Sequence, residues 1–198
     1  MQASGTPTTG PDLLTILVNI GQIIPAFIGM LQWVVLFMGL YLFVAGLIQL
    51  FAAEDGASRY IATAVRPTVS GALAHIVFGV FLMTMGDLEL VGILSRSLTG
   101  NYANSRMLSY GTAGTTLADR AAQAQQALLG ILQIVGFIAM TKGILTFNQH
   151  YSQGQSKASL GTATTWLLGG ILAWNFLWFG TAVNELVGYA VIPLYGSP

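Results

Sequence analysis

Two histidines, His75 and His150, are the residues of this 198-residue chain whose type best suits metal or acid–base chemistry. They lie far apart in the sequence, and neither has a second His or a carboxylate four residues away. A zinc site needs three or four ligands at close spacing, so we expect no metal site. The chain also has no Cys, which excludes a thiolate ligand and a Cys nucleophile.

Sequence motifs of nucleotide-driven or covalent catalysis are missing as well. The chain has no Gly-rich phosphate loop ending in Gly-Lys-Ser/Thr and no Gly-x-Ser-x-Gly nucleophile elbow. We therefore predict no catalytic residues, no cofactor and no enzymatic activity. A role in transport would draw its energy from a partner protein.

Composition places the chain in a membrane. It is 54% hydrophobic and only 7% charged, whereas soluble domains carry about 25% charged residues. So little charge cannot cover a soluble surface, and the excess apolar surface must face lipid or other protein. The net charge is zero and the basic residues are scattered singly, which argues against sequence-specific nucleic-acid binding.

Hydrophobic runs predict the helices. Pro25 favours a break, giving a short helix at 13–24 before the first span. The four spans are predicted at 26–53, 68–86, 127–147 and 160–183. The fold class is thus all-α: an integral membrane four-helix protein with two helical hairpins joined by a polar loop. The first hairpin, with the polar N-terminal segment and the short helix, occupies 1–89, the connecting loop 90–126, and the second hairpin and tail 127–198. The end of the connecting loop, 117–126, is predicted as a polar helical lead-in to the third span.

The two hairpins resemble each other. Leu-Gln at 31–32 recurs at 132–133, and Glu-Leu-Val-Gly at 89–92 recurs at 185–188. Matches this short are compatible with an internal duplication and also with chance.

Basic residues predict the orientation. The two short turns hold Arg59, Arg66 and Lys157, whereas both termini lack Lys and Arg. The positive-inside rule therefore favours cytoplasmic turns with the termini and the central loop outside. Lys142 lies inside the third span, where its ammonium either snorkels to the interface or contacts a lipid phosphate or a partner carboxylate. These four residues are our candidates for contact with lipid or with the lumen of an assembly.

Small and polar residues inside the spans are candidates for helix packing. Small residues let helix backbones approach closely in lipid, and polar side chains there hydrogen-bond across helices. His75 has a proton or ligand role as its alternative. The candidates are Gly136, Ala139, Gly143, Gly169, Gly170, Ala173, His75 and Asn175.

The third and fourth spans carry a family resemblance. Gly-Phe-Ile-Ala at 136–139, Lys-Gly at 142–143 and Leu-Gly-Gly-Ile-Leu-Ala-Trp-Asn at 168–175 resemble the small inner-membrane proteins called IcmC or DotE in type IVB secretion and TraQ in conjugation. The match is specific over 130–175 and looser over 25–90. His75 and Trp174 replace more common aliphatic residues, and the sister IcmD/DotP/TraR-like group is an alternative.

Each hairpin also resembles conjugative pilins of the TrbC type, which have two apolar helices and a short basic turn. Together the resemblances imply a structural component of a conjugative or type IVB secretion apparatus in a bacterial inner membrane. They further imply a homo-oligomer or filament, bound phospholipid, other subunits of the apparatus as partners, and extrusion as a pilus. The alternatives are a scaffold or chaperone of that machine and a small independent transporter.

Overall fold

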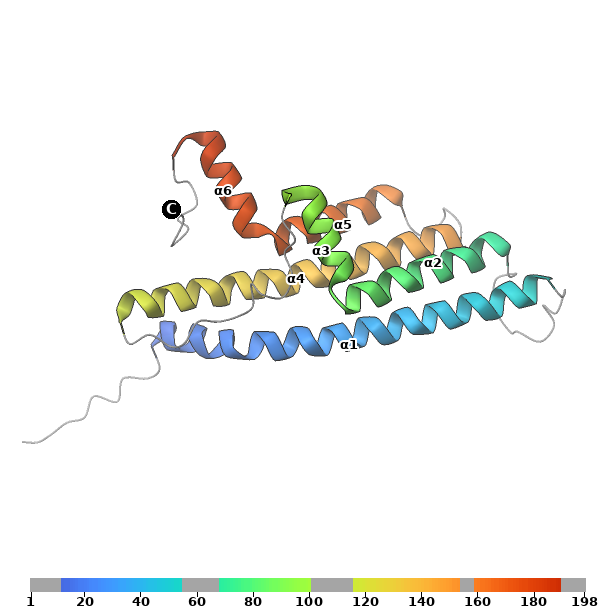
Figure 1. Ribbon diagram of the computed structural model, residues 1–198, viewed down its shortest axis with the longest axis horizontal. Helices are drawn as coiled ribbons and strands as arrows, with labels where there is room; N and C mark the ends of the chain where they lie inside the picture. Colours follow the sequence, from blue (N-terminus) through green and yellow to red (C-terminus); the bar gives the residue numbers. More distant parts are fainter. Residues whose placement is uncertain (1–11, 55–67, 101–115, 154–158, 190–198) are drawn as a thin grey trace, which may run out of the picture.

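The computed structural model describes residues 12–54, 68–100, 116–153 and 159–189, which form six α-helices and no strand (Figure 1). The helices are α1 (Leu13–Glu54), α2 (Val69–Gly86), α3 (Glu89–Thr99), α4 (Leu117–Gln153), α5 (Leu160–Trp174) and α6 (Phe176–Val187). The predicted all-α class is confirmed. We refer to α1–α3 as the N-terminal half and to α4–α6 as the C-terminal half.

Long apolar helices of a membrane protein are present, as predicted. Three described helices are long and apolar enough to cross a membrane, and there are four if the bent pair α5–α6 counts as one span. α2 agrees with the span predicted at 68–86. A continuous helix over the span predicted at 160–183 is wrong, because the chain bends by 84° between α5 and α6.

The break predicted at Pro25 is also wrong, since α1 is continuous over 42 residues with the proline inside it. Proline removes one helical hydrogen bond, but packing can hold a helix together across that loss. Ile24 and Ile28, on either side of the proline, are buried, and α4 packs alongside α1. Tertiary packing therefore overrides the local preference for a break.

The segment 90–126, predicted as a polar loop with a helical end, is more helical than expected. The helical lead-in predicted at 117–126 is confirmed as the first turns of α4, but nearly all of α3 also lies in the segment. Residues 101–115 lie outside the described residues. α3 turns away from α2 at Leu88, whose φ of 61° is left-handed. That conformation costs a non-glycine residue about 1–2 kcal/mol, and Leu88 tolerates it because its side chain is buried in the core.

The two halves repeat the same close helix contact. A Cβ built on Gly39 of α1 would lie 2.7 Å from the backbone oxygen of Gly79 on α2. A Cβ built on Gly136 of α4 would lie 2.7 Å from the backbone oxygen of Gly170 on α5. Each pair of helices therefore touches backbone to backbone, with no space for a methyl group at the contact.

A second glycine contact follows one heptad later in both halves. A Cβ on Gly46 would lie 2.8 Å from the Ile76 nitrogen of α2, and a Cβ on Gly143 would lie 2.9 Å from the Leu167 nitrogen of α5. Thr68 and Ser159 are the N-cap residues of α2 and α5. The repeat thus relates residues 97 positions apart on the long helices and 91 apart on the shorter ones, and we call such residues repeat counterparts.

This register differs from the one that the short sequence matches predict. Leu-Gln at 31–32 has Leu-Leu at 128–129 as its repeat counterpart, not the Leu-Gln at 132–133. Glu-Leu-Val-Gly begins α3 at 89–92 but ends α6 at 185–188. Both matches are therefore coincidental, although the two halves do repeat one structure.

The halves run parallel but are shifted along the helix direction (Figure 1). The Arg120 Nη2 of α4 donates to the Thr15 Oγ1 of α1 at 2.7 Å. The repeat counterpart of Arg120 is Ile23, which lies eight residues after Thr15. At 1.5 Å per residue the shift is about 12 Å, and in Figure 1 α4 starts beyond the start of α1 and stops short of its end.

A second contact between the halves gives a similar shift. The Thr141 Oγ1 of α4 lies 3.7 Å from the Met85 sulfur of α2. Met85 precedes Gly86, which abuts the Gln32 backbone of α1. Val44, the repeat counterpart of Thr141, lies twelve residues after Gln32, which corresponds to about 18 Å. The two halves are therefore related by a displacement of about 12–18 Å along α1.

The hydrophobic core joins the two halves at the level of the α2–α3 bend. It contains one residue each of α1 and α3, Leu88 at the bend, and two or three residues each of α2, α4 and α5, while α6 contributes none. Its members are Val35, Leu82, Met85, Leu88, Val91, Phe137, Met140, Ile144, Ile171 and Trp174.

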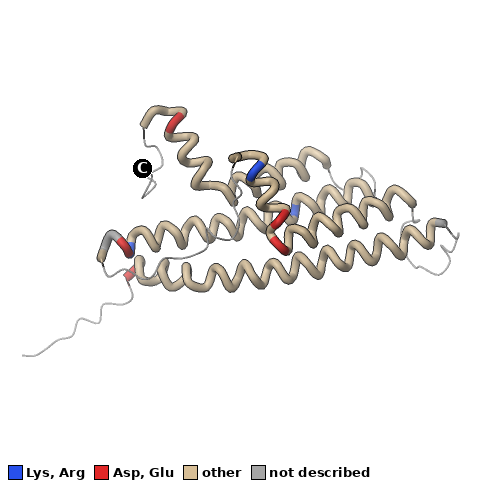
Figure 2. Tube along the Cα trace, viewed as in Figure 1, with Lys and Arg blue, Asp and Glu red and all other residues tan. Residues whose placement is uncertain are grey.

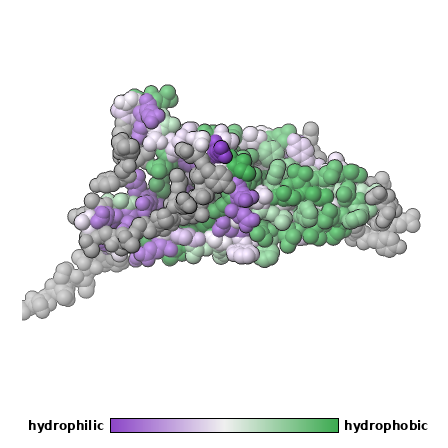
Figure 3. All heavy atoms as spheres, viewed as in Figure 1, coloured by the Kyte–Doolittle hydropathy of each residue, from purple (hydrophilic) through white to green (hydrophobic). Residues whose placement is uncertain are grey.

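On the face shown in Figure 3, hydrophobic atoms cover the end of the molecule formed by α2 and the C-terminal part of α1, and hydrophilic atoms gather toward the other end.

Adjacent glycines of α5 provide a matched test of the close contact. In Gly170→Ala the new Cβ would meet the Gly136 oxygen at 2.7 Å, so we expect a loss of about 1–3 kcal/mol from overpacking. Gly169 has no atom within 4 Å of its Cβ position, so Gly169→Ala is expected to leave stability unchanged or raise it slightly. Unfolding of detergent-solubilised protein measures both, and equal effects of the two substitutions would contradict the contact.

Candidate functional site

A partly buried polar contact joins α2 to α4 across the two halves. The His75 Nδ1 lies 2.9 Å from the Asn148 Oδ1, and Asn148 is buried. Because the amide oxygen accepts, Nδ1 carries the hydrogen and donates. In an apolar environment such a bond replaces the lost hydration of both groups and aligns the helices.

A second polar contact lies at the α5–α6 break. The Ser95 Oγ of α3 donates to the Asn175 Oδ1 at 2.9 Å, and the Asn175 Nδ2 donates to the Ile171 oxygen at 2.9 Å. The Ile171 oxygen also accepts from the Asn175 backbone N–H at 3.0 Å, so Asn175 closes the end of α5 with both of its nitrogens and ties α3 of the other half to the break. Ser95 and Asn148 are absent from the candidates predicted from sequence, because each partner lies 73 or more residues away.

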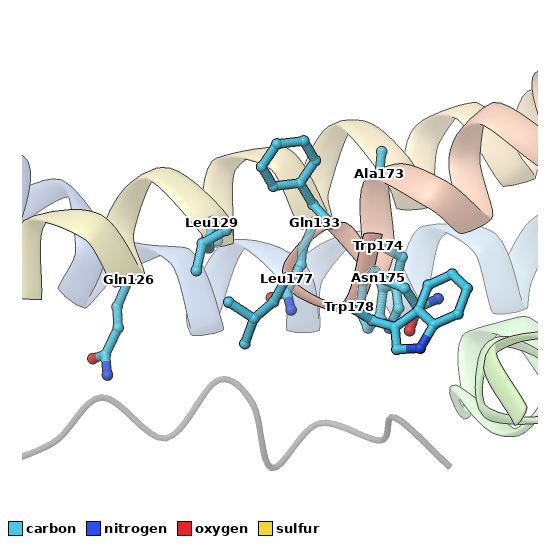
Figure 4. Close-up of a pocket in the computed structure, with 10 residues that line it drawn as sticks. Gln126, Leu129, Gln133, Ala173, Trp174, Asn175, Leu177 and Trp178 are labelled. Carbon is cyan, nitrogen blue, oxygen red and sulfur yellow. The ribbon is translucent and has the colours of Figure 1, made fainter. Parts of the chain in front are cut away.

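Next to the α5–α6 break lies a cavity of about 160 Å³ between α4 and the bent pair. Gln133 lines it and is only 8% exposed. In Figure 4 its side chain extends from α4 toward Leu177 and Asn175, whereas Gln126 points away from them. The cavity therefore combines amide groups with aromatic and aliphatic walls, without an ionisable side chain among its lining residues.

The N-terminal half has a hollow in the equivalent place, at the α2–α3 break. Its lining residues are Gln32, Trp33, Leu36, Gly86 and Asp87. Their repeat counterparts Leu129, Gly130, Gln133, Leu177 and Trp178 all line the cavity of the C-terminal half. The repeat thus extends from the helix contacts to the concave surfaces, whose chemistry differs: one holds a carboxylate and the other only amides and apolar groups.

Lys142 lies on the outer surface of α4. Its Nζ is 3.9 Å from the centre of the Trp166 ring on α5, a distance at which the ring face attracts a cation. Figure 2 shows the charged residues concentrated near the starts of α1 and α4, around α3 and on α6, with long uncharged stretches between them. The other predicted basic candidates, Arg59, Arg66 and Lys157, lie outside the described residues.

The predicted packing candidates lie in different surroundings. Gly136, Gly143 and Gly170 form the contact between α4 and α5. Ala139 is buried in α4, and Ala173 lines the cavity beside the break. Gly169 differs from the rest, because no atom of the described residues lies within 4 Å of its Cβ position.

Within the described part of the chain, no group of three or more His, Asp or Glu residues could hold a metal ion. Comparisons with protein-family models, with curated proteins and with solved structures find no match to the chain. The described residues offer groups for binding and packing: amides, an imidazole, the hydroxyls of Ser95 and Thr141, a cation on an aromatic ring and apolar walls.

The His75–Asn148 bond can be measured with a double-mutant cycle of His75→Leu and Asn148→Leu. We expect a coupling free energy of about 0.6 kcal/mol, and at most about 1.7 kcal/mol, because interhelical bonds in lipid are of this size. His75→Leu with Thr164→Val is the control, since Thr164 bonds only its own helix in the structure. Additivity within about 0.3–0.5 kcal/mol in both cycles would show that the bond does not couple the helices.

Proposed function

We propose that the chain is a structural membrane subunit of a conjugative or type IVB secretion apparatus, of the IcmC/DotE/TraQ-like kind that its third and fourth spans resemble. In this proposal it is a pilin-like subunit that polymerises with lipid into a transfer pilus or channel. It lies in the bacterial inner membrane before assembly, with its helix pairs as two membrane hairpins, basic turns in the cytoplasm, and other subunits of the apparatus as partners.

The observation that carries the proposal is the length of apolar surface on α1. Its 42 residues extend about 63 Å, twice the roughly 30 Å of a bilayer core. Gly86, the last residue of α2, abuts α1 at Gln32 and Leu36, so about twenty residues of α1 continue past the end of α2. That stretch exposes large apolar side chains, among them Leu13, Ile23 and Met30.

Apolar surface in excess of the bilayer needs protein to cover it. Other copies of the chain supply that cover in a polymer, where neighbouring long helices pack side by side. An isolated transporter has no need of such a surface. The uncovered length of α1 therefore supports a subunit of an assembly rather than an independent transporter.

The displacement between the halves supports a filament in particular. Two units related by a rotation alone can close into a ring, whereas a translation along the axis leads to an open helical array. The halves run parallel (Figure 1) and are displaced by about 12–18 Å along α1. One chain therefore already contains a step of the kind that a helical polymer repeats.

Lipid binding belongs to the same proposal. Lys142 is exposed, and its ammonium rests on Trp166, which orients the cation at the outer surface of α4. A lipid phosphate is the natural counterion for a cation held there. We propose that phospholipid between neighbouring subunits occupies this place.

The assembly role is tested by deletion of the coding sequence in the host, combined with electron microscopy of sheared appendages and of purified protein. We expect loss of transfer and a helical array that contains the chain. Unchanged transfer with a defect in solute uptake would instead indicate an independent transporter. Intact pili without the chain, together with lowered levels of one membrane partner, would indicate a scaffold or chaperone.

The lipid role is tested by the phospholipid that copurifies with three variants. Lys142→Met should reduce anionic phospholipid per chain, because the cation is lost, whereas Lys142→Arg should retain it. Arg96→Met is the matched control, since it removes an exposed cation of α3. Equal lipid content in Lys142→Met and Arg96→Met would contradict the proposed site.

A further inference from the structure

One face of α4 is buried between the two halves. It is formed by Ala127, Gly130, Phe137, Thr141 and Asn148, all of them buried. Asn148 and Thr141 contact α2 from this face, and Phe137 belongs to the core shared by the halves. This α4 face is therefore the surface by which the C-terminal half binds the N-terminal half.

The repeat counterpart of that face on α1 has no cover. It is formed by Met30, Trp33, Leu40, Val44 and Phe51, which we call the open α1 face. Each of these five side chains is at least 42% exposed. The same position that is an interface in one half is thus a bare apolar strip in the other.

The complementary surface is also present twice. α2 meets the α4 face with His75, Phe78 and Met85, where Phe78 stacks on Phe147 with ring centres 6.2 Å apart. Their repeat counterparts are Trp166, Gly169 and Phe176. Trp166 and Gly169 form what we call the open α5 face, whereas Phe176 lies beyond the bend, in α6. Trp166 is 38% exposed and Gly169 has no atom within 4 Å of its Cβ position.

The repeat also predicts which residues of the two open faces lie opposite each other. Inside the chain, Phe78 of α2 stacks on Phe147 of α4, and their repeat counterparts are Gly169 and Leu50. The Cβ position of Gly169 has open space around it, so a side chain of α1 such as Leu50 can enter the place that the Phe78 ring fills inside the chain.

We propose that the open α1 face of one copy packs on the open α5 face of the next copy, so that the contact between chains repeats the contact between halves. This rests on the self-association in the proposed function but not on its transfer role. Each new copy would then continue the axial displacement already present inside the chain, and the partner of the bare strip is a second copy of this chain.

Cysteine cross-linking tests the contact directly, because the chain has no Cys of its own. Phe51→Cys and Trp166→Cys, the counterparts of Asn148 and His75, are introduced separately into two differently tagged chains that are coexpressed in membranes. Oxidation should link the two tags. In the control, Val77→Cys replaces Phe51→Cys, since Val77 is an exposed residue of α2 outside both faces. The yield of its cross-link to Trp166→Cys should be at least tenfold lower.

A substitution at Gly169 tests the same contact without cross-linking. Gly169→Leu fills the open space on α5 and should leave unfolding of the monomer unchanged, while abolishing both the Phe51–Trp166 link and the assembled particles. Assembly with links at Val77 but not at Phe51 would overturn this contact and leave the proposed function standing. A chain that stays monomeric in membranes and forms no link at any position would overturn both.

Discussion

The structure depends on one constraint: in each half, a long helix and a shorter one touch backbone to backbone. A methyl group on Gly39 or Gly136 would meet a backbone oxygen of the facing helix at 2.7 Å. In lipid, where water gives no driving force between helices, such closeness maximises dispersion contacts. The glycine contact also determines which face of each long helix packs against the shorter helix of its own half. All other surfaces of the molecule, buried or bare, follow from how the two close pairs are then placed.

Composition and hydrophobic runs were enough to predict the helical class and the presence of long apolar helices, because both depend on averages over many residues. The exceptions involve single residues. Pro25 has a strong local preference against helix, yet α1 continues through it because Ile24 and Ile28 are buried on either side. Asn175 has no comparable local signal: it stands between apolar runs, and the bend is recorded only in its bonds to Ser95 and Ile171.

The polar contacts of the candidate site were likewise predictable only in part. His75 and Asn175 attract attention in sequence because a polar group in an apolar helix needs a partner. The partners themselves, Asn148 and Ser95, could not be predicted, since they depend on how the two halves are placed. The register of the repeat was hidden for a related reason. It is kept by glycine contacts and N-cap residues, whereas the short sequence matches fall out of register.

The displacement of the halves explains why the molecule has bare apolar faces at all. Two equal halves related by a twofold axis would each cover the same face of the other, and the pair would be closed. Here the α4 face is covered by the N-terminal half, while its counterpart on α1 is left open. A translation always leaves one such face at each end of the series, however many units are joined. Adding a further unit moves the open face along the axis without removing it. In a chain whose halves are related by such a translation, each added copy covers the open face of the previous one. The longer the array, the fewer apolar side chains per copy remain uncovered by protein.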